Sequence, residues 1–416
     1  MTGTLRADTA DAPLTPEKLE SIGASLPFGM ARLLELGLRI GRGAVGVTLP
    51  DGRRLLLRGG EPGLEAEIVI RDFACARRLA LQGDIGFAEA YLSGEWESPD
   101  IVAVLRLFAH NAEHFQNLLD GKPLAQMLQR MRHWLNRNTK SQARRNIHAH
   151  YDLGNRFYEA WLDGTMTYSS ALFAPGDNDL SAAQLRKYRA LADSIGLKPD
   201  HNVLEIGCGW GGFAEFAAKE IGCQVTGLTI SHEQFGFARA RIAKAGLADR
   251  VTIKLQDYRD ETGRYDRLAS IEMFEAVGEQ YWPVYFRQLA DLLKPGGVAG
   301  LQIITIQERL FENYRREIDF IRRYIFPGGM LPSPERLRDL AGRVGLTFQG
   351  EKIFGQDYAV TLAQWRDRFY AAWPSLVPLG FDERFKRMWE YYLSYCEAGF
   401  REGNIDVRQL VYSKPG

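Results

Sequence analysis

Apolar and polar residues alternate near the start of the chain. Every second residue is apolar from Val45 to Leu49, and Leu55 and Leu57 stand at the same spacing after the Asp-Gly pair. A period of two places these side chains on one face of a strand, and an Asp-Gly pair between two such runs favours a tight turn. The pattern therefore predicts a β-hairpin that turns at Asp51-Gly52.

This region continues with one more strand and then with helical spacing. An apolar run within Glu67–Arg71 predicts a third strand. We expect a small α+β domain over residues 26–120, with no catalytic constellation, after a flexible leader at residues 1–25. The predicted helices of this domain cover residues 72–81, 85–92 and 101–115.

Short apolar runs separated by helical patterns fill the second half of the chain. Such runs are typical of buried parallel strands. We therefore predict a doubly wound α/β domain over residues 146–416, with a smaller α+β domain before it. Val407–Ser413 would add a late antiparallel strand at the edge of the sheet. The predicted parallel strands are Val203–Ile206, Val225–Leu228, Val251–Leu255 and Leu268–Ile271.

Composition narrows the class of protein. The chain has 416 residues and no net charge, which favours two domains and argues against general nucleic-acid binding. The sequence shows no signal peptide and no apolar run long enough to cross a membrane. Its four cysteines have no metal or redox spacing, so we expect a cytosolic protein with reduced thiols and no metal.

Residues 121–145 contain basic residues and no acidic one, interleaved with apolar positions. One interpretation is a solvated linker helix. The other is a basic amphipathic surface that meets anionic lipid headgroups. The basic residues nearest the second domain are Arg130, Arg132, Arg137, Lys140, Arg144 and Arg145.

A glycine-rich turn follows the first strand of the second domain. Gly207, Gly209 and Gly211 stand between this strand and a predicted helix, a layout that cradles a nucleotide-like cofactor. The glycine spacing by itself leaves NAD open. The second strand, however, ends in Thr229 where a dinucleotide site would carry an acid.

Four motifs together resemble the cyclopropane-fatty-acyl-phospholipid synthase family and its mycolic acid cyclopropane synthase relatives. They are His150–Asn155, Thr165–Ser170, Glu205–Gly211 and Phe326–Gly329. The resemblance implies a class I, Rossmann-like methyltransferase that uses S-adenosylmethionine to modify a cis double bond in a membrane acyl chain. It also implies that residues 305–332 help to wall the acyl pocket.

The resemblance assigns cofactor contacts to residues of the turn and of the strand ends. Thr229 has an alternative interpretation as a plain helix N-cap. The expected cofactor-binding residues are Tyr151, Tyr168, Ser169, Glu205, Gly207, Gly209, Gly211, Thr229, Ile230, Gln234, Asp257, Tyr258 and Ile271.

Catalytic residues are expected after the fourth strand. In Glu272-Met273-Phe274-Glu275, two acids three residues apart share a helical face, and their apolar context indicates that at least one is buried. The resemblance makes Glu275 the active-site glutamate. Tyr168, Phe274 and Tyr358 are candidates to stabilise a carbocation through their aromatic faces.

The family holds a bound bicarbonate as the base. By resemblance its ligands here are Glu275, Tyr358, a backbone N–H at Ser170, and a histidine whose position is occupied by Gln302. Glutamine donates a hydrogen bond but carries neither charge nor a transferable proton. Ring closure is therefore less firmly implied than methyl transfer.

The leading prediction is methylene transfer onto unsaturated phospholipid acyl chains, which forms a cyclopropane. A methyl-branched or methylated unsaturated chain, and a small-molecule N-methyltransferase, are the alternatives. A lipid-binding protein without catalysis is disfavoured because the cofactor turn and Glu275 are intact. We expect a cytoplasmic enzyme associated peripherally with the inner membrane. The sequence leaves open whether it forms a homodimer.

Overall fold

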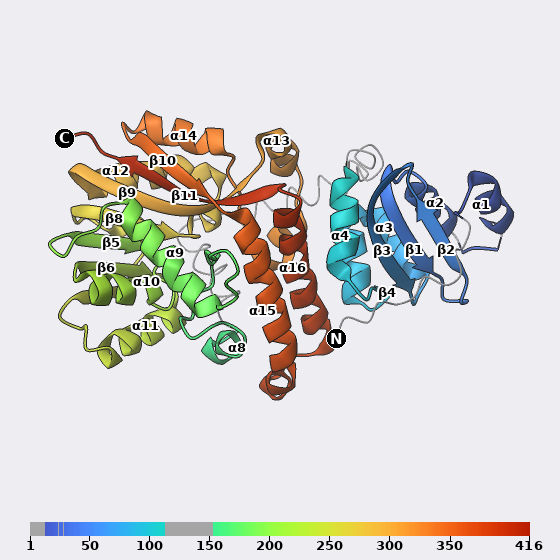
Figure 1. The fold of residues 1–416 in the computed structure, drawn as a ribbon, viewed down its shortest axis with the longest axis horizontal. Helices are drawn as coiled ribbons and strands as arrows, with labels where there is room; N and C mark the ends of the chain where they lie inside the picture. The colour runs from blue at the N-terminus through green and yellow to red at the C-terminus, as the bar shows by residue number, and fades with distance from the viewer. Residues whose placement is uncertain (1–12, 24, 28, 113–152) are drawn as a thin grey trace. The chain divides into compact units, whose positions relative to one another are not determined.

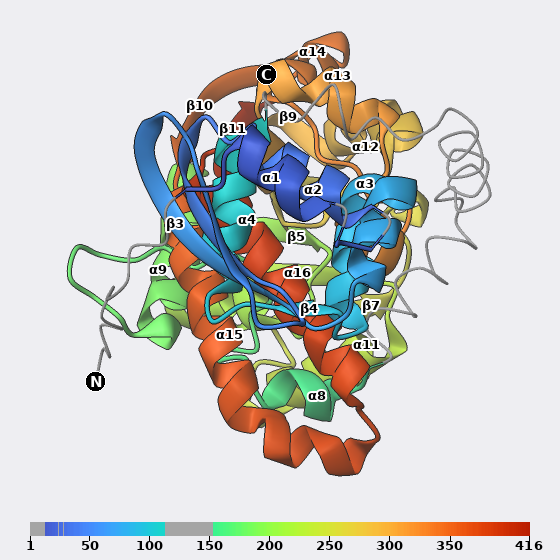
Figure 2. The same ribbon diagram turned by 90° about the vertical axis from the view of Figure 1, so that its right-hand side faces the viewer.

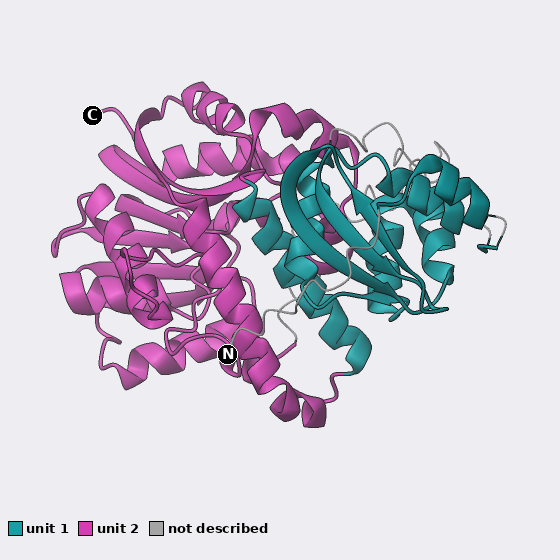
Figure 3. Ribbon diagram, turned by 45° about the vertical axis from the view of Figure 1, so that its right-hand side comes forward, with its two compact units in different colours: residues 1–128, 382–402 teal, residues 129–381, 403–416 magenta. Residues whose placement is uncertain are grey.

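The computed structural model describes residues 13–23, 25–27, 29–112 and 153–416. The chain divides into two compact units, coloured separately in Figure 3. Unit 1 comprises residues 1–128 and 382–402, and unit 2 comprises residues 129–381 and 403–416. Residues 382–402 belong to the N-terminal unit, although the prediction placed them in the C-terminal domain.

Unit 1 contains a four-stranded sheet in the order β2-β1-β3-β4. The predicted hairpin is present, since β1 and β2 pair antiparallel around Asp51-Gly52. Helix α4 packs on β3 and against α16 (Figures 1 and 2). The elements are α1 (Pro16–Gly23), α2 (Met30–Gly37), β1 (Arg42–Thr48), β2 (Arg54–Arg58), β3 (Glu61–Ile70), α3 (Ala74–Leu92), β4 (Trp96–Glu97), α4 (Ile101–His110) and α16 (Glu383–Arg401).

One local prediction for unit 1 needs correction and another is confirmed. The expected leader is helical from Pro16 to Gly23, and Leu19 is buried in the unit. The two helices expected on either side of residue 83 are the two halves of α3, which break at Gly83 where φ is 61°. A left-handed residue of this kind favours glycine, so the break has a local cause.

Unit 2 is built on a seven-stranded sheet in the order β10-β11-β9-β8-β5-β6-β7. Strands β5 to β9 pair in parallel, while β11 runs antiparallel to both β9 and β10. The elements are α8 (Asn155–Glu159), α9 (Leu180–Ser194), β5 (Asn202–Ile206), α10 (Gly212–Phe216), η1 (Ala217–Ile221), β6 (Gln224–Thr229), α11 (His232–Lys244), β7 (Val251–Leu255), η2 (Tyr258–Asp260), β8 (Tyr265–Ile271), η3 (Phe274–Ala276), η4 (Glu279–Tyr281), α12 (Trp282–Leu292), β9 (Leu293–Ile306), α13 (Glu308–Arg316), η5 (Ile321–Ile325), α14 (Pro334–Arg343), β10 (Thr347–Ile353), α15 (Gly355–Leu376), η6 (Val377–Leu379) and β11 (Ile405–Ser413).

The doubly wound α/β fold is confirmed, with one strand placed differently. The late strand is antiparallel as predicted, but it lies between β9 and β10 and not at the edge. The edge position belongs to β10, whose Ile353 is half exposed. The sequence gives no direct sign of this order, because β10 is the more polar of the two strands.

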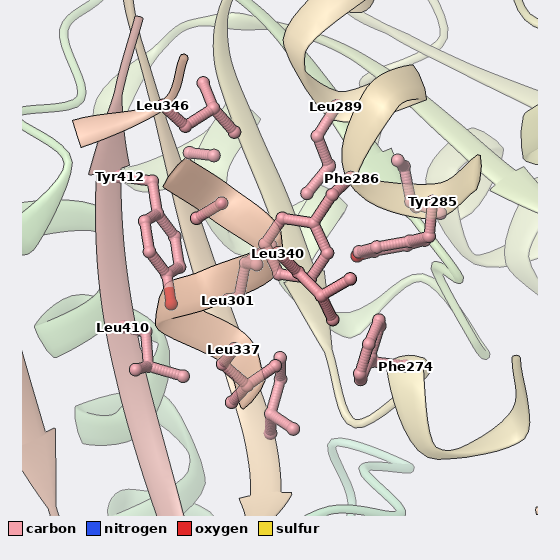
Figure 4. Packing of buried hydrophobic residues seen from close by; sticks show 14 of the residues in the cluster. Phe274, Tyr285, Phe286, Leu289, Leu301, Leu337, Leu340, Leu346, Leu410 and Tyr412 are labelled. Carbon is pink, nitrogen blue, oxygen red and sulfur yellow. The ribbon is translucent and has the colours of Figure 1, made fainter. Parts of the chain in front are cut away.

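Alternating strand residues supply two separate cores on the two faces of the sheet. Val203 packs with Phe213 and Ala238 of α10 and α11, whereas its neighbour Leu204 packs with residues of α12 and α14. Figure 4 shows part of the second core, where Phe274 and Phe286 lie close to Tyr285. Helices therefore cover both faces, as a parallel sheet requires.

The strand order reverses between β5 and β8. The chain moves from β5 outward to β7 and then returns to β8 on the other side of β5. In open α/β sheets, ligands bind at the carboxyl ends of the strands at such a switch point. Within the described part of the chain, no helix is long and apolar enough to cross a membrane.

Candidate active site

The cofactor turn, residues 205–211, joins the end of β5 to α10. Gly207, Gly209 and Gly211 all have positive φ angles, of 81°, 52° and 82°. A Cβ added at Gly209 would meet no atom within 4 Å, so the space beside it is open. At Gly207 a Cβ would lie 2.6 Å from Cγ of Met273. The turn thus offers bare backbone to open space and packs tightly against the segment that follows β8.

Glu205 is the acid of this turn, and its carboxylate is incompletely satisfied. It is 2% exposed and accepts the backbone N–H of Ala214. Its Oε2 has no hydrogen-bond partner among the described residues. Burial raises the pKa of Glu205 to about 8, against the opposing charges of Lys187 and Arg241. A buried acid with one oxygen that lacks a partner in the described chain fits a positively charged ligand such as S-adenosylmethionine.

Lys187 on α9 connects this acid electrostatically to the rest of the site. Its buried ammonium donates to Oγ of Ser169 at 2.6 Å, and Gln184 donates to the carbonyl of the same serine at 2.8 Å. Burial lowers the pKa of Lys187 to about 8, while the charges of Glu272 and Glu205 act in the opposite direction. Two hydrogen bonds from α9 therefore fix the position of Ser169.

The carboxyl end of β6 carries the next expected contacts. Thr229 donates its hydroxyl to Oε1 of Gln234 at 2.9 Å, and Ile230 beside it is half-buried. Thr229 is not the N-cap of α11, so that alternative is wrong. Ser231 caps the helix by accepting the N–H of Gln234 at 3.3 Å.

The ends of β7 and β8 bring further predicted residues to the same edge of the sheet. Asp257 is 2% exposed and accepts two hydrogen bonds from the guanidinium of Arg259, at 2.8 and 2.6 Å. The guanidinium also lies over the ring of Tyr258, 5.6 Å from its centre. Ile271 is the last residue of β8 and is half-buried. Tyr151 lies outside the described residues.

A chain of aromatic rings runs from the cofactor turn to the end of β8. Trp210 of the turn lies 5.0 Å from Tyr158, whose ring is 5.4 Å from that of Tyr168. Tyr168 lies 5.3 Å from Trp365 on α15, and Trp365 is 6.0 Å from Tyr358. We call these five residues the aromatic chain. Its last member reaches the acid that follows β8.

That acid is Glu272, which three separate elements contact. Its Oε1 accepts the N–H of Ser170 at 2.8 Å and the amide of Gln302 at 2.7 Å. Its Oε2 accepts the hydroxyl of Tyr358 at 2.6 Å. Its φ is 48°, a left-handed value that side chains other than glycine adopt at a cost. The loop before α9, strand β9 and helix α15 thus converge on one carboxylate.

Glu275 lies close by, in the 3-10 helix Phe274–Ala276. Its Oε1 accepts the N–H of Ile304 at 2.5 Å, and its Oε2 is buried without a partner among the described residues. Burial, together with the negative charge of Glu272, raises the pKa of Glu275 to about 8. Burial also raises the pKa of Glu272, but Lys187 and its hydrogen bonds oppose that shift. Burial thus raises the pKa of both carboxyls, while Lys187 and three hydrogen-bond donors favour the ionised form of Glu272 more than that of Glu275.

The donors predicted for bicarbonate therefore converge on one group, but that group is a side chain of the protein. Ser170 N–H, Tyr358 and Gln302 all contact Glu272, while Glu275 bonds to the backbone of Ile304. The carboxylate of Glu272 uses the hydrogen-bond donors that the resemblance assigns to an external anion.

Two other expectations for this segment need correction. Glu272 and Glu275 do not share a regular helical face, because Glu272 precedes the 3-10 helix. Phe274 is fully buried and packs on Trp282 and Tyr285 in the core (Figure 4), so it is not exposed to a reacting chain.

The sequence prediction gave a specific role to Glu275 alone, whereas the structure places Glu272 where the donors converge. One signal was available: an acid stands directly after a parallel strand at the switch point, where ligands bind. A second signal was the glutamine at position 302, which suits a carboxylate neighbour because its amide can donate. Neither signal shows that the two side chains meet, since their contact joins β8 to β9.

The fold and the cofactor turn define a class I S-adenosylmethionine-dependent methyltransferase. Residues 138–410 match the family model described as mycolic acid cyclopropane synthetase, and the chain belongs to this family. The resemblance predicted from the sequence motifs is thereby confirmed.

Relatives of two kinds match over most of the chain. Tuberculostearic acid methyltransferase of Mycobacterium tuberculosis is 41% identical over 375 residues, 86% of this chain and 85% of that protein. Cyclopropane-fatty-acyl-phospholipid synthase of Escherichia coli is 35% identical over 386 residues, 88% of this chain and 95% of that protein. The crystal structure of mycolic acid cyclopropane synthase CmaA1 complexed with SAH and CTAB has a TM-score of 0.62 and 31% identity. It covers 65% of this chain and 98% of that one.

Proposed function

We propose that the protein transfers a methyl group from S-adenosylmethionine to the double bond of an unsaturated phospholipid acyl chain. The observation that carries the proposal is the pairing of two half-sites at adjacent strands. The end of β5 holds Glu205, an acid with one unpartnered oxygen among the described residues, and the segment after β8 holds the acids Glu272 and Glu275. This arrangement suits a reaction that needs both a cationic methyl donor and a base.

The residues of the turn would hold the cofactor. Gly209 gives access to backbone, and the spare oxygen of Glu205 offers a negative charge. The bound cofactor supplies an electrophilic methyl group, which the electron pair of the alkene attacks. The aromatic chain connects the cofactor turn to Glu272, and aromatic faces stabilise a nearby cation by about 2 kcal/mol when water is excluded.

As product we propose a methylated chain that keeps one double bond. Loss of a proton from the cation gives this product without any reductant. Two observations support it: Gln302 replaces the expected histidine, and a 41% identical relative is named a methyltransferase and not a ring-forming synthase.

A cyclopropane is the second candidate product. It is favoured by the 35% identical phospholipid synthase and by the presence of a carboxylate, Glu272, among the donors assigned to bicarbonate. The two products have the same mass. They differ in which carbon loses the proton, and therefore in whether the new bond closes a ring or forms a double bond.

The experiment uses purified protein, S-adenosylmethionine and vesicles of a phosphatidylglycerol with cis-monounsaturated chains. Mass spectrometry should show acyl chains heavier by one CH₂ unit, and Gly209→Val protein should show none. Proton NMR then separates upfield cyclopropane methylene signals from vinylic or methylene-alkene signals. No mass gain on any unsaturated lipid would overturn the proposal, and a gain on an added amine alone would favour the N-methyltransferase alternative.

We further propose that residues 121–145, which lie outside the described residues, bring the enzyme to anionic lipid. Their support is compositional, since each cation near a charged surface contributes about 1 kcal/mol. The double variant Arg144→Glu/Arg145→Glu should sediment poorly with anionic vesicles, and wild-type binding should weaken with salt. The matched control reverses Arg338 and Arg343, two exposed arginines of α14. Equal binding by both variants would show that the basic stretch is only solvated.

A further inference from the structure

Glu272 has a backbone conformation that its own side chain disfavours. A non-glycine residue with φ near 48° is strained, whereas glycine adopts this angle freely. A glycine would also spare the protein the desolvation of a carboxylate. Residues held in such conformations gather at functional sites, so the strain at Glu272 calls for a functional reason.

The position of Glu272 supplies that reason. β8 pairs with β5, and Met273 packs directly against Gly207 of the cofactor turn. Glu272 therefore follows the strand next to the turn, at the switch point of the sheet. The aromatic chain, which begins in the turn at Trp210, ends at Tyr358, and Tyr358 donates its hydroxyl to Glu272.

We propose that Glu272 is the base of the reaction, a built-in carboxylate that takes the place of external bicarbonate. The inference rests on the proposed function. The three donors on its oxygens fix its orientation and stabilise the ionised form before the cation is generated.

The proton balance is complete with this one residue. The alkene pair forms the bond to the methyl carbon, and the pair of the broken carbon–sulfur bond stays on sulfur. The electron pair of a C–H bond beside the resulting cation then forms a new bond to the cationic carbon, which gives the double bond of the methylated product. The proton of that C–H bond moves to an oxygen of Glu272, which becomes a neutral carboxylic acid and later returns the proton to water. No oxidant or reductant takes part.

Glu272 suits this step better than Glu275 does. Glu275 lies beside the negative charge of Glu272 and has one oxygen without a partner, so it holds its proton near neutral pH. A protonated acid cannot accept another proton. A hydrogen next to a carbocation is so acidic that a carboxylate need not be strongly basic; it must be ionised and in place.

Three variants test the assignment by turnover on the vesicles described above. Glu272→Gln keeps the shape and removes the charge, and kcat should fall on the order of 10²–10⁴-fold with unchanged cofactor affinity. Glu275→Gln mimics the protonated acid and should lose far less, and Glu220→Gln is an exposed control. Wild-type turnover should not change when bicarbonate is removed. A Glu272→Gln enzyme within threefold of wild type, or a wild type that slows without bicarbonate, would overturn the proposal.

A binding measurement decides the anion position even if no lipid is methylated. Glu272→Gly relieves the strain at φ 48° and leaves the Ser170, Gln302 and Tyr358 donors without their carboxylate. Carbon-13 NMR with labelled bicarbonate should show binding to Glu272→Gly and not to the wild type, and added bicarbonate should restore turnover of that variant. Bicarbonate binding to the wild type would contradict the inference. Turnover failure in every protein would instead count against the proposed function.

Discussion

Glu205 lies in β5 and Glu272 directly follows the neighbouring parallel strand β8, and the hydrogen bonding of these two acids differs. Glu205 accepts a backbone N–H and leaves Oε2 without a partner among the described residues. Both oxygens of Glu272 are engaged by side-chain or backbone donors. In the proposed reaction, an acid with a spare oxygen receives a ligand, whereas an acid whose donors are already in place substitutes for one. The same residue type would then have opposite tasks at the ends of two neighbouring strands.

The largest effect is expected at the glycine turn. Gly209→Val should abolish cofactor binding, because the side chain would fill the open space beside Gly209. Calorimetry with S-adenosylmethionine measures this directly. Gly246→Val is the matched control, since Gly246 also has a positive φ, of 69°, and equally open surroundings after α11. Unchanged affinity in a folded Gly209→Val protein would remove the cofactor assignment.

A smaller loss is expected at Glu205. Glu205→Gln should weaken cofactor binding about 10- to 100-fold, the usual value of a charge-assisted hydrogen bond. Because burial raises the pKa of Glu205 to about 8, binding a cation below that pH requires release of a proton. The affinity of the wild type relative to Glu205→Gln should therefore rise from pH 6 to about pH 8 and then level off.

The amino group of the cofactor titrates equally in both proteins and cancels in this ratio. Lys187 is present in both, but the charge of Glu205 raises its pKa, so the ratio reports Glu205 together with its effect on Lys187. A ratio that is independent of pH would show that Glu205 is not the group that meets the cationic ligand.

The two halves of the site also differ in how far the sequence predicts them. The cofactor half follows from local patterns: a strand, a glycine turn and a helix are contiguous, and Thr229 and Asp257 stand at the ends of successive strands. Such spacing needs only the periodicity of the chain and the general rule for ligand positions in parallel sheets.

The other half depends on contacts that no local pattern fixes. Ser170, Gln302 and Tyr358 reach Glu272 from sequence distances of 102, 30 and 86 residues. The same limitation explains the misplaced β11, whose position between β9 and β10 is set by long-range pairing. It also explains why α16 could not be assigned to unit 1 from the sequence.

A stability measurement sharpens the distinction between Glu272 and its neighbour Glu275. The pKa of Glu275 is raised to about 8 from an ordinary value of 4.5, so the folded protein binds more protons than the unfolded one between these pH values. Its contribution to the free energy of unfolding is therefore fully present below pH 4.5 and is lost as pH rises toward 8. Glu275→Gln should raise Tm relative to wild type by several degrees more at pH 8.5 than at pH 5. The exposed Glu220→Gln control should show no such trend, and a parallel pH course for Glu275→Gln and wild type would refute the shift.

The smallest effect is expected when Glu272 loses one of its three donors. Gln302→Ala removes the 2.7 Å bond to Oε1, which is worth about 1 kcal/mol and should reduce kcat/KM about 3- to 10-fold. Loss of a donor disfavours the ionised carboxylate, so the pKa of Glu272 rises. Since the base must be ionised to accept a proton, the acid limb of the pH–rate profile should move to higher pH. Gln409→Ala is the matched control, because Gln409 donates to Oε1 of Gln302 but does not contact Glu272. A shift of the acid limb in Gln302→Ala alone would support Glu272 as the titrating base, whereas equal shifts in both variants would indicate a general loosening of the buried strands and contradict it.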